Sequence, residues 1–158
     1  MYAKIVVPLD GSELSEHSLP HATAIAKQFE ATLHLVRVFE MSALAAGAVP
    51  IADPSLAAAS VSSGVYEQAM EAEHEKVESY LKEVADRIKG DVAKLEYSVQ
   101  HGSTVEILAS LVEQLPADLV VMTTKGEGGF KRFVFGSVTS DLLRRLEVPV
   151  LVVPNKED

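Results

Sequence analysis

The chain of 158 residues contains no cysteine. This absence excludes a disulfide framework, thiol chemistry and a zinc–thiolate centre, because each of these needs cysteine sulfur. The fold must instead be stabilised by a buried apolar core, for which this length is sufficient. We therefore expect one domain over residues 1–158, with a long flexible loop at about residues 40–64.

A long uninterrupted apolar run is also missing. The apolar stretch at residues 41–65 is broken by Pro50, Asp53, Pro54 and several serines, which argues against a membrane span. A strand-like segment begins at Tyr2, so we expect no signal peptide at the start of the chain. These features predict a cytoplasmic protein that does not insert into membranes.

Positive charge is scarce in this sequence. Lysine and arginine number 14 against 23 acidic residues, which gives a net charge of -9. We expect no nucleic-acid partner, because phosphate backbones are bound by faces rich in lysine and arginine. A small phosphate ligand would have to be met locally, and Lys125, Lys131 and Arg132 form a local cationic group.

Five short runs rich in apolar and β-branched residues predict strands at residues 4–9, 32–39, 93–100, 118–123 and 149–153. The first, fourth and last runs are apolar almost throughout, as in strands covered on both faces of a parallel sheet.

Helical patterns separate these strands. Ser12 is a suitable N-cap for a helix that extends to about residue 29, and Pro20 should kink or divide that helix. Apolar residues at helical spacing mark three further helices. These residues are Val77, Leu81, Val84 and Ile88, then Val105, Leu108, Leu111, Val112 and Leu115, then Val138, Leu142, Leu143 and Leu146. The alternation predicts an α/β fold, an open five-stranded parallel sheet with helices on both faces.

The most informative stretch is residues 119–143, where an apolar strand leads into a glycine-rich, cationic loop and then into a helix that begins at Gly136 and Ser137. Glycines let a backbone approach an anion closely, and the N–H groups of a first helical turn point toward it. The loop, at about residues 124–135, is longer than the usual connection of about 2–6 residues. This stretch predicts a phosphate site.

Asp10 is the second candidate ligand residue, because it follows the first strand. Ligands of open α/β sheets bind beyond the carboxyl ends of the strands, where the direction of winding reverses. If the first and fourth strands are neighbours there, Asp10 could accept hydrogen bonds from a ribose while Gly126, Gly136 and Ser137 bind phosphates. Alternatively, Asp10 and Ser137 only cap their helices. Neither a Walker A motif nor GxGxxG is present to decide between the two.

Gly126, residues 127–135, Gly136 and Ser137 form a pattern of glycine, nine residues, glycine and serine. In this pattern the chain resembles the universal stress protein family, whose ATP-binding members have glycine, two residues, glycine, nine residues, glycine and then Ser/Thr. The opening KIVVPLDGSE (residues 4–13) and the closing VPVLVVP (residues 148–154) are also similar, so the resemblance covers essentially the whole chain. At two positions the chain differs. Thr123 replaces the first glycine, and Glu127 adds negative charge to the loop.

This resemblance implies a Rossmann-like sheet of order 3-2-1-4-5 and a site for ATP. Pro8 and Asp10 would line the adenosine site, and Val38 would contact adenine. The full set of implied ligand-binding residues is Pro8, Asp10, Val38, Thr123, Lys125, Gly126, Gly129, Gly136 and Ser137. Mg²⁺ or Mn²⁺ is expected to accompany a polyphosphate.

Metal-ligating and catalytic patterns are weak in the sequence. His17 and His21 have the i, i+4 spacing of helical metal ligands, but Pro20 interrupts their helix and no third ligand is evident. No arrangement pairs a nucleophile with a base and an orienting acid. We therefore expect no metal site and no enzyme activity beyond slow ATP turnover.

The last predicted strand, from Pro149 to Val153, is short and apolar. At the edge of a sheet it could pair with its two-fold mate, which predicts a homodimer. The leading interpretation is a dimeric universal stress protein that binds ATP as a regulatory ligand in stress response or signalling. Two alternatives stay open. One is a protein-interaction module of the same fold without nucleotide, as Thr123 and Glu127 favour, and the other is a slow ATPase.

Overall fold

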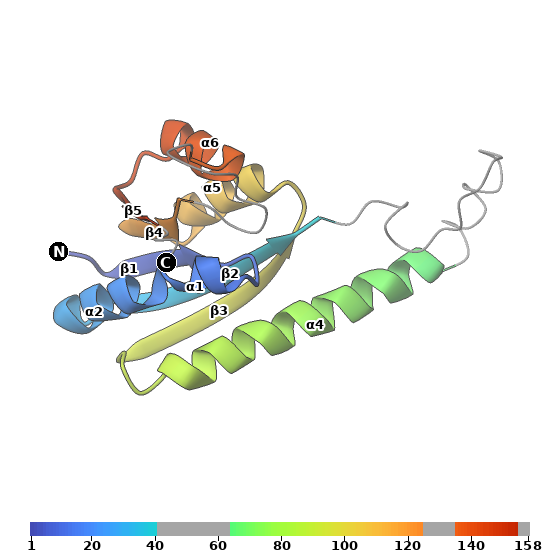
Figure 1. Ribbon diagram of the computed structural model, residues 1–158, viewed down its shortest axis with the longest axis horizontal. Coiled ribbons are helices and arrows are strands. Elements are labelled where there is room, and N and C mark those ends of the chain that lie inside the picture. The colour runs from blue at the N-terminus through green and yellow to red at the C-terminus, as the bar shows by residue number, and fades with distance from the viewer. Residues whose placement is uncertain (41–63, 125–134, 155–158) are drawn as a thin grey trace.

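The computed structural model describes residues 1–40, 64–124 and 135–154 and contains a parallel sheet with helices on both faces (Figure 1). The sheet has five strands in the order β3-β2-β1-β4-β5. Its strands are β1 (Lys4–Pro8), β2 (Thr32–Phe39), β3 (Lys94–His101), β4 (Leu119–Thr123) and β5 (Val150–Val153). All four pairings are parallel. The predicted fold class and strand order are confirmed, and the strand bounds differ from the prediction by one residue at most.

The helices also follow the predicted order. They are α1 (Glu13–Glu16), α2 (Leu19–Phe29), α4 (Val65–Ile88), α5 (Thr104–Gln114) and α6 (Ser137–Arg145). The predicted helix at residues 12–29 is divided into α1 and α2, with Pro20 in the first turn of α2, where its missing N–H needs no partner. Ser12 caps α1, and its hydroxyl accepts a hydrogen bond of 3.2 Å from the Ser15 N–H. The predicted 40–64 loop lies almost wholly outside the described residues.

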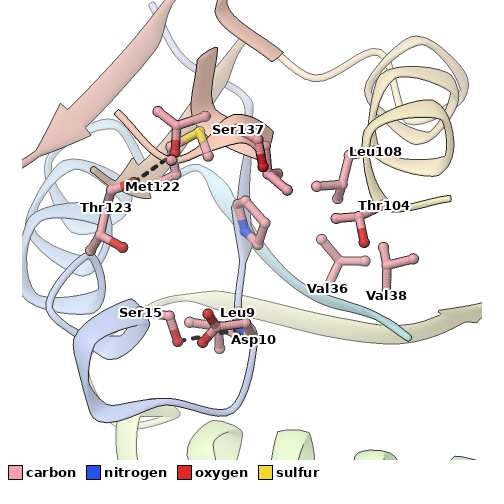
Figure 2. Close-up of a pocket in the computed structure, with 14 residues that line it drawn as sticks. Leu9, Asp10, Ser15, Val36, Val38, Thr104, Leu108, Met122, Thr123 and Ser137 are labelled. Carbon is pink, nitrogen blue, oxygen red and sulfur yellow. Dashed lines mark hydrogen bonds between the residues drawn. The ribbon is translucent and has the colours of Figure 1, made fainter. Parts of the chain in front are cut away.

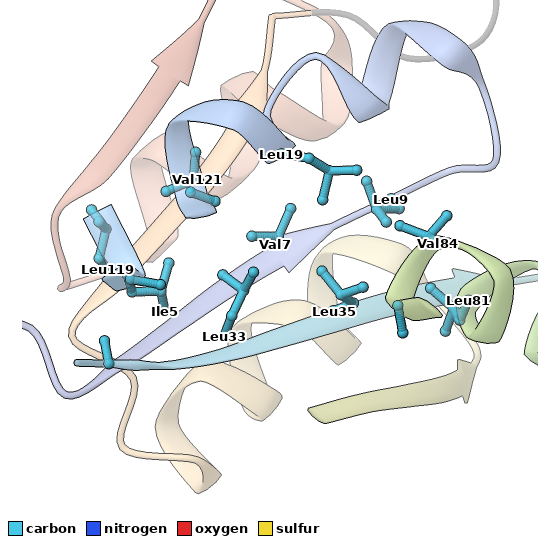
Figure 3. Close-up of a cluster of buried hydrophobic side chains, with 14 of the residues drawn as sticks. Ile5, Val7, Leu9, Leu19, Leu33, Leu35, Leu81, Val84, Leu119 and Val121 are labelled. Carbon is cyan, nitrogen blue, oxygen red and sulfur yellow. The ribbon is translucent and has the colours of Figure 1, made fainter. Parts of the chain in front are cut away.

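Alternation along the strands divides the core into two layers. In the first layer, side chains of β1, β2 and β4 pack under α2 and α4 (Figure 3). Its larger buried members are Ile5, Val7, Leu33, Leu35, Leu81, Val84, Leu119 and Val121. In the second layer, the opposite faces of the same strands pack under α5 and α6. This layer contains Val6, Val36, Leu108, Leu111, Val112, Val120 and Leu142.

One residue of the predicted apolar stripes does not belong to the core. Leu143 is 39% exposed, whereas its neighbour Leu142 is fully buried. Successive residues of a helix point about 100° apart, so a short helix that buries Leu142 against the sheet turns Leu143 toward solvent. Leu143 therefore lies in the predicted helix but outside its buried stripe.

The position of β1 fixes where a ligand can bind. β1 pairs with β2 on one side and with β4 on the other, so the winding direction reverses at its carboxyl end. This reversal leaves a crevice between the loops that follow the two neighbouring strands.

Candidate functional site

A cavity of about 250 Å³ lies at the carboxyl ends of β1, β2 and β4 (Figure 2). Its walls also include Ser15 of α1 and the first residues of α5 and α6. The described lining consists of Pro8, Leu9, Asp10, Ser15, Val36, Val38, Thr104, Leu108, Met122, Thr123, Gly136, Ser137, Val138 and Thr139. It includes six of the predicted ligand residues: Pro8, Asp10, Val38, Thr123, Gly136 and Ser137. The other three, Lys125, Gly126 and Gly129, lie outside the described residues.

One end of the cavity is apolar. Val36 and Val38 from β2 lie there beside Leu108 and the hydroxyl-bearing Thr104 of α5 (Figure 2). The N–H of Thr104 donates a hydrogen bond of 3.0 Å to the Glu40 carboxylate, which fixes the start of α5 against the end of β2. This surface suits a flat apolar ring.

Sequence reasoning missed most of this apolar end. Val36 could have been found, because residues two apart in a strand face the same side and Val38 was already a candidate. Thr104 and Leu108 had no comparable local signal, since their position depends on where α5 packs on the sheet.

Asp10 lies at the second wall of the cavity, where β1 ends. Its Oδ1 accepts hydrogen bonds from the N–H of Ser12 at 2.9 Å and from the Ser12 hydroxyl at 2.5 Å. The Asp10 N–H donates to the Ser15 hydroxyl at 3.3 Å, and that hydroxyl donates to the Ser12 carbonyl at 2.8 Å. Ser12 is therefore the helix cap, and Asp10 is the acidic group that holds the cap and faces the cavity.

The start of α6 forms the third wall. Gly136 is the N-cap residue, with φ of -56° and ψ of 158°, a conformation open to any residue. A Cβ added to Gly136 would lie 3.6 Å from the Thr124 carbonyl oxygen, an ordinary contact. The fold therefore does not require glycine here, whereas a bare backbone lets an anion approach the first N–H groups of the helix. Ser137, the first helical residue, lies beside it.

Thr123 stands at the end of β4, where the family motif has its first glycine. Thr123 is buried, with 6% of its surface exposed, and its carbonyl accepts a hydrogen bond of 3.2 Å from the Thr139 hydroxyl. Thr123 is among the residues that line the cavity.

The two histidines considered as metal ligands belong to different helices. His17 caps the end of α1 and His21 lies in α2, and both are exposed. Across residues 1–40, 64–124 and 135–154, no group of three His, Cys, Asp or Glu side chains is arranged to hold a metal ion.

A different histidine forms an unexpected arrangement. His34 Nε2 lies 2.9 Å from the Ser98 hydroxyl, and Nδ1 lies 3.3 Å from Glu96 Oε2. Lys4 donates to the same Glu96 oxygen at 3.0 Å. Burial lowers the pKa of His34, although Glu96 acts to raise it, so the imidazole is neutral at pH 7.

This contact between a hydroxyl, an imidazole and a carboxylate was not anticipated from the sequence. The sequence could not show the link, because it depends on the pairing of β2 with β3. Ser98, His34 and Glu96 lie outside the described cavity lining. Their arrangement gives both ring nitrogens of the buried His34 a hydrogen-bond partner.

Helices able to span a bilayer are absent from the part of the chain that the structure describes.

Comparison with known proteins finds a match to the model of the universal stress protein family over residues 1–154. A universal stress protein of Methanocaldococcus jannaschii, MJ0531, is 31% identical over 159 aligned residues, which cover 99% of this chain and 86% of that protein.

Solved structures of the same fold include two with nucleotides. A universal stress protein in complex with cAMP is 24% identical, with a TM-score of 0.65 and coverage of 98% of each chain. The universal stress protein from Archaeoglobus fulgidus in complex with dAMP is 17% identical, with a TM-score of 0.62 and coverage of 96% of this chain and 97% of that one. At these identities the likeness shows the shared fold.

Proposed function

Because the chain belongs to the universal stress protein family, we propose that its cavity binds an adenine nucleotide, ATP above all, as a regulatory ligand. The observation that carries the proposal is a convergence of three walls on one cavity. The cavity has an apolar wall, an acidic group at the end of β1, and the N-terminus of α6 with a glycine N-cap. Each wall suits one part of a nucleotide.

Adenine would lie between Val36, Val38 and Leu108, with Thr104 at its edge. The ribose hydroxyls would donate to Asp10 next to Pro8. Phosphates would lie against the backbone of Gly136 and Ser137, beside Thr123. The family resemblance implies that Gly126 also binds phosphate, with Lys125 and Gly129 nearby. The relatives solved with cAMP and dAMP support an adenine ligand.

A divalent cation would arrive with the polyphosphate. The described residues contain no three-ligand cage for a metal, and Asp10 is the sole acidic side chain of the described lining. We therefore propose that Mg²⁺ or Mn²⁺ would be held chiefly by phosphate oxygens and water, as is usual for Mg²⁺.

The site suits a regulatory ligand better than a turnover reaction. The described part of the lining holds no histidine, cysteine or lysine, which leaves Asp10 as its one group able to take a proton from water. We propose that nucleotide occupancy changes a surface that another protein binds in the cytoplasm, and that the protein acts as a dimer through β5.

Thermal or urea denaturation with and without ATP–Mg²⁺ tests the proposal. A ligand at 100-fold over its dissociation constant should stabilise the fold by about 2.7 kcal/mol. We expect Asp10→Ala to lose most of this stabilisation relative to its own ligand-free state. Asp91→Ala, at an exposed residue after α4, is the matched control and should keep it.

Two results would contradict the nucleotide site. One is the absence of any shift at millimolar ATP, which would favour an interaction module without nucleotide. The other is an equal shift in wild type and Asp10→Ala. Phosphate release above the Asp10→Ala background would instead indicate an ATPase.

A further inference from the structure

The cavity depends on α1, a helix of four residues, Glu13–Glu16. So short a helix is unstable by itself, yet its Ser15 lines the cavity and bonds to the Asp10 N–H. Whatever holds α1 in place therefore also holds the acidic wall of the proposed nucleotide site.

The outer side of α1 is bound to α4 through one carboxylate. The Tyr80 hydroxyl donates a hydrogen bond of 3.0 Å to Glu16 Oε1, and Arg87 Nη2 donates one of 2.6 Å to Glu16 Oε2. Tyr80 and Arg87 are seven residues apart, which places them on one face of α4. We call Glu16, Tyr80 and Arg87 the α1–α4 clamp. The Glu16 side chain is 20% exposed and the Arg87 side chain 53% exposed, so water partly screens this ion pair.

A cation from the sheet completes the packing. The Arg37 guanidinium lies 5.2 Å from the ring centroid of Tyr80, within the range of a cation–π interaction. The same guanidinium lies beside Gly11, where an added Cβ would meet Arg37 Nη1. Gly11 has φ of +87°, and this backbone conformation favours glycine. The turn that follows Asp10 thus packs directly on Arg37.

The clamp continues into the cavity wall. Burial and Glu16 raise the pKa of Tyr80, while the neighbouring Ser15 hydroxyl acts to lower it, so the phenol remains a hydrogen-bond donor. Ser15 bonds to Asp10 and Ser12, and Ser12 bonds back to Asp10. Hydrogen bonds therefore connect the Asp10 carboxylate to Ser12 and Ser12 to Ser15, and the next residue of α1, Glu16, bonds to α4.

We propose that Glu16 is a positioning residue for the nucleotide site, which it holds in shape by tying α1 to α4 through Tyr80 and Arg87. The inference rests on the proposed function and adds a means of regulation. Because coupling between two sites is reciprocal, a nucleotide that orders Asp10 and α1 also tightens the clamp and makes α4 more rigid. Any protein that binds α4 would then sense the occupancy of the cavity.

Nucleotide affinity of clamp variants tests the proposal directly. Tyr80→Phe removes only a hydroxyl, and Arg87→Gln removes one charged donor. We expect each to weaken ATP–Mg²⁺ binding by about three- to tenfold in isothermal titration, the range for losing one hydrogen bond. The matched control is Lys89→Gln, which breaks the 2.9 Å pair with Asp86 on the same helix without touching α1. Its affinity should equal that of wild type.

Hydrogen exchange supplies a readout that a purely structural role would not move. We expect ATP to protect the amides around Tyr80 and Arg87 in wild type, and Tyr80→Phe to lose much of that protection at saturating ATP. The inference is overturned if the variants melt at lower temperature yet bind ATP as tightly as wild type. It is overturned equally if ATP leaves exchange in α4 unchanged. If the wild-type protein binds no nucleotide, both the proposed function and this inference fail.

Discussion

At the scale of single residues, His34 links stability to pH. Its pKa is lowered, chiefly because the ring is buried, so the folded state favours the neutral imidazole. The unfolded state takes up a proton near pH 6.5. A group whose pKa is lower in the folded state than in the unfolded state stabilises the fold at pH values above its unfolded-state pKa. This stabilisation is lost as the pH falls.

We therefore expect the free energy of unfolding to decrease between about pH 7.5 and pH 5.5. His34→Gln, which does not titrate, should flatten this dependence, whereas His17→Gln, at an exposed position, should keep it. Urea denaturation across this window provides the measurement. The carboxylates with lowered pKa values are Asp86, Glu96 and Asp118, and they titrate below this pH window. An unchanged slope in His34→Gln would contradict the assignment.

Gly136 gives a second prediction at this scale, in which stability and binding change in opposite directions. Serine is a preferred N-cap residue, and the conformation of Gly136 accepts a side chain. We expect Gly136→Ser to melt at the same temperature as wild type or higher. Its hydroxymethyl group would intrude where phosphates approach α6, so ATP–Mg²⁺ should bind at least about tenfold more weakly. Differential scanning fluorimetry and titration calorimetry measure the two effects. Unchanged affinity would mean that phosphates do not approach this helix start.

At the scale of secondary-structure elements, α4 is held mainly by its apolar stripe. Leu81 is fully buried between α4 and the sheet, so Leu81→Ala should lower the free energy of unfolding by about 2–5 kcal/mol. Leu143→Ala in α6 removes the same atoms from a residue that is 39% exposed, and we expect a change within about 0.5 kcal/mol. Urea denaturation of both variants at pH 7 checks the contrast. Similar losses would mean that α4 contributes less to the core than its burial indicates.

The pairing of α1 with α4 shows how one element depends on another. The single turn of α1 has its own cap at Ser12, but its outer surface is fixed by Tyr80 and Arg87, far along the chain. Changes in α4 can therefore reach the cavity without touching it.

At the scale of the whole molecule, the two edge strands of the sheet differ in the side chains that they expose. β5 forms one edge and is paired with β4, and β3 forms the other and is paired with β2. β5 is apolar and partly exposed along Val150, Leu151 and Val152, whereas β3 presents Lys94 and Glu96. Charged side chains protect an edge from association, so we expect the dimer to form at β5.

Sedimentation equilibrium tests this assembly. Val152→Glu places a charge in the proposed interface, where it would lie close to its two-fold copy, so we expect monomers. Tyr97→Glu places the same charge on the opposite edge, at a side chain that is 38% exposed, and the dimer should persist. A monomeric wild-type protein, or a dimer lost only in Tyr97→Glu, would contradict an interface at β5.

Much of the architecture could be predicted from the sequence because it is encoded locally. Strand and helix positions follow from the spacing of apolar residues over a few turns or pleats. The division of the first helix follows from Pro20, whose ring and missing N–H act within one turn. The candidate site was predicted in part for the same reason, since Asp10, Gly136 and Ser137 sit where strands end or helices begin.

The sequence by itself determined which segments form strands and helices, and which strand ends are polar or bare enough to receive an anion. Only the tertiary structure decided which distant side chains meet. Thr104 and Leu108 line the cavity, Glu16 bonds to Tyr80, and His34 bonds to Ser98. Local periodicity fixes the face on which a side chain lies, but contacts across tens of residues depend on strand order, register and the packing of helices on the sheet.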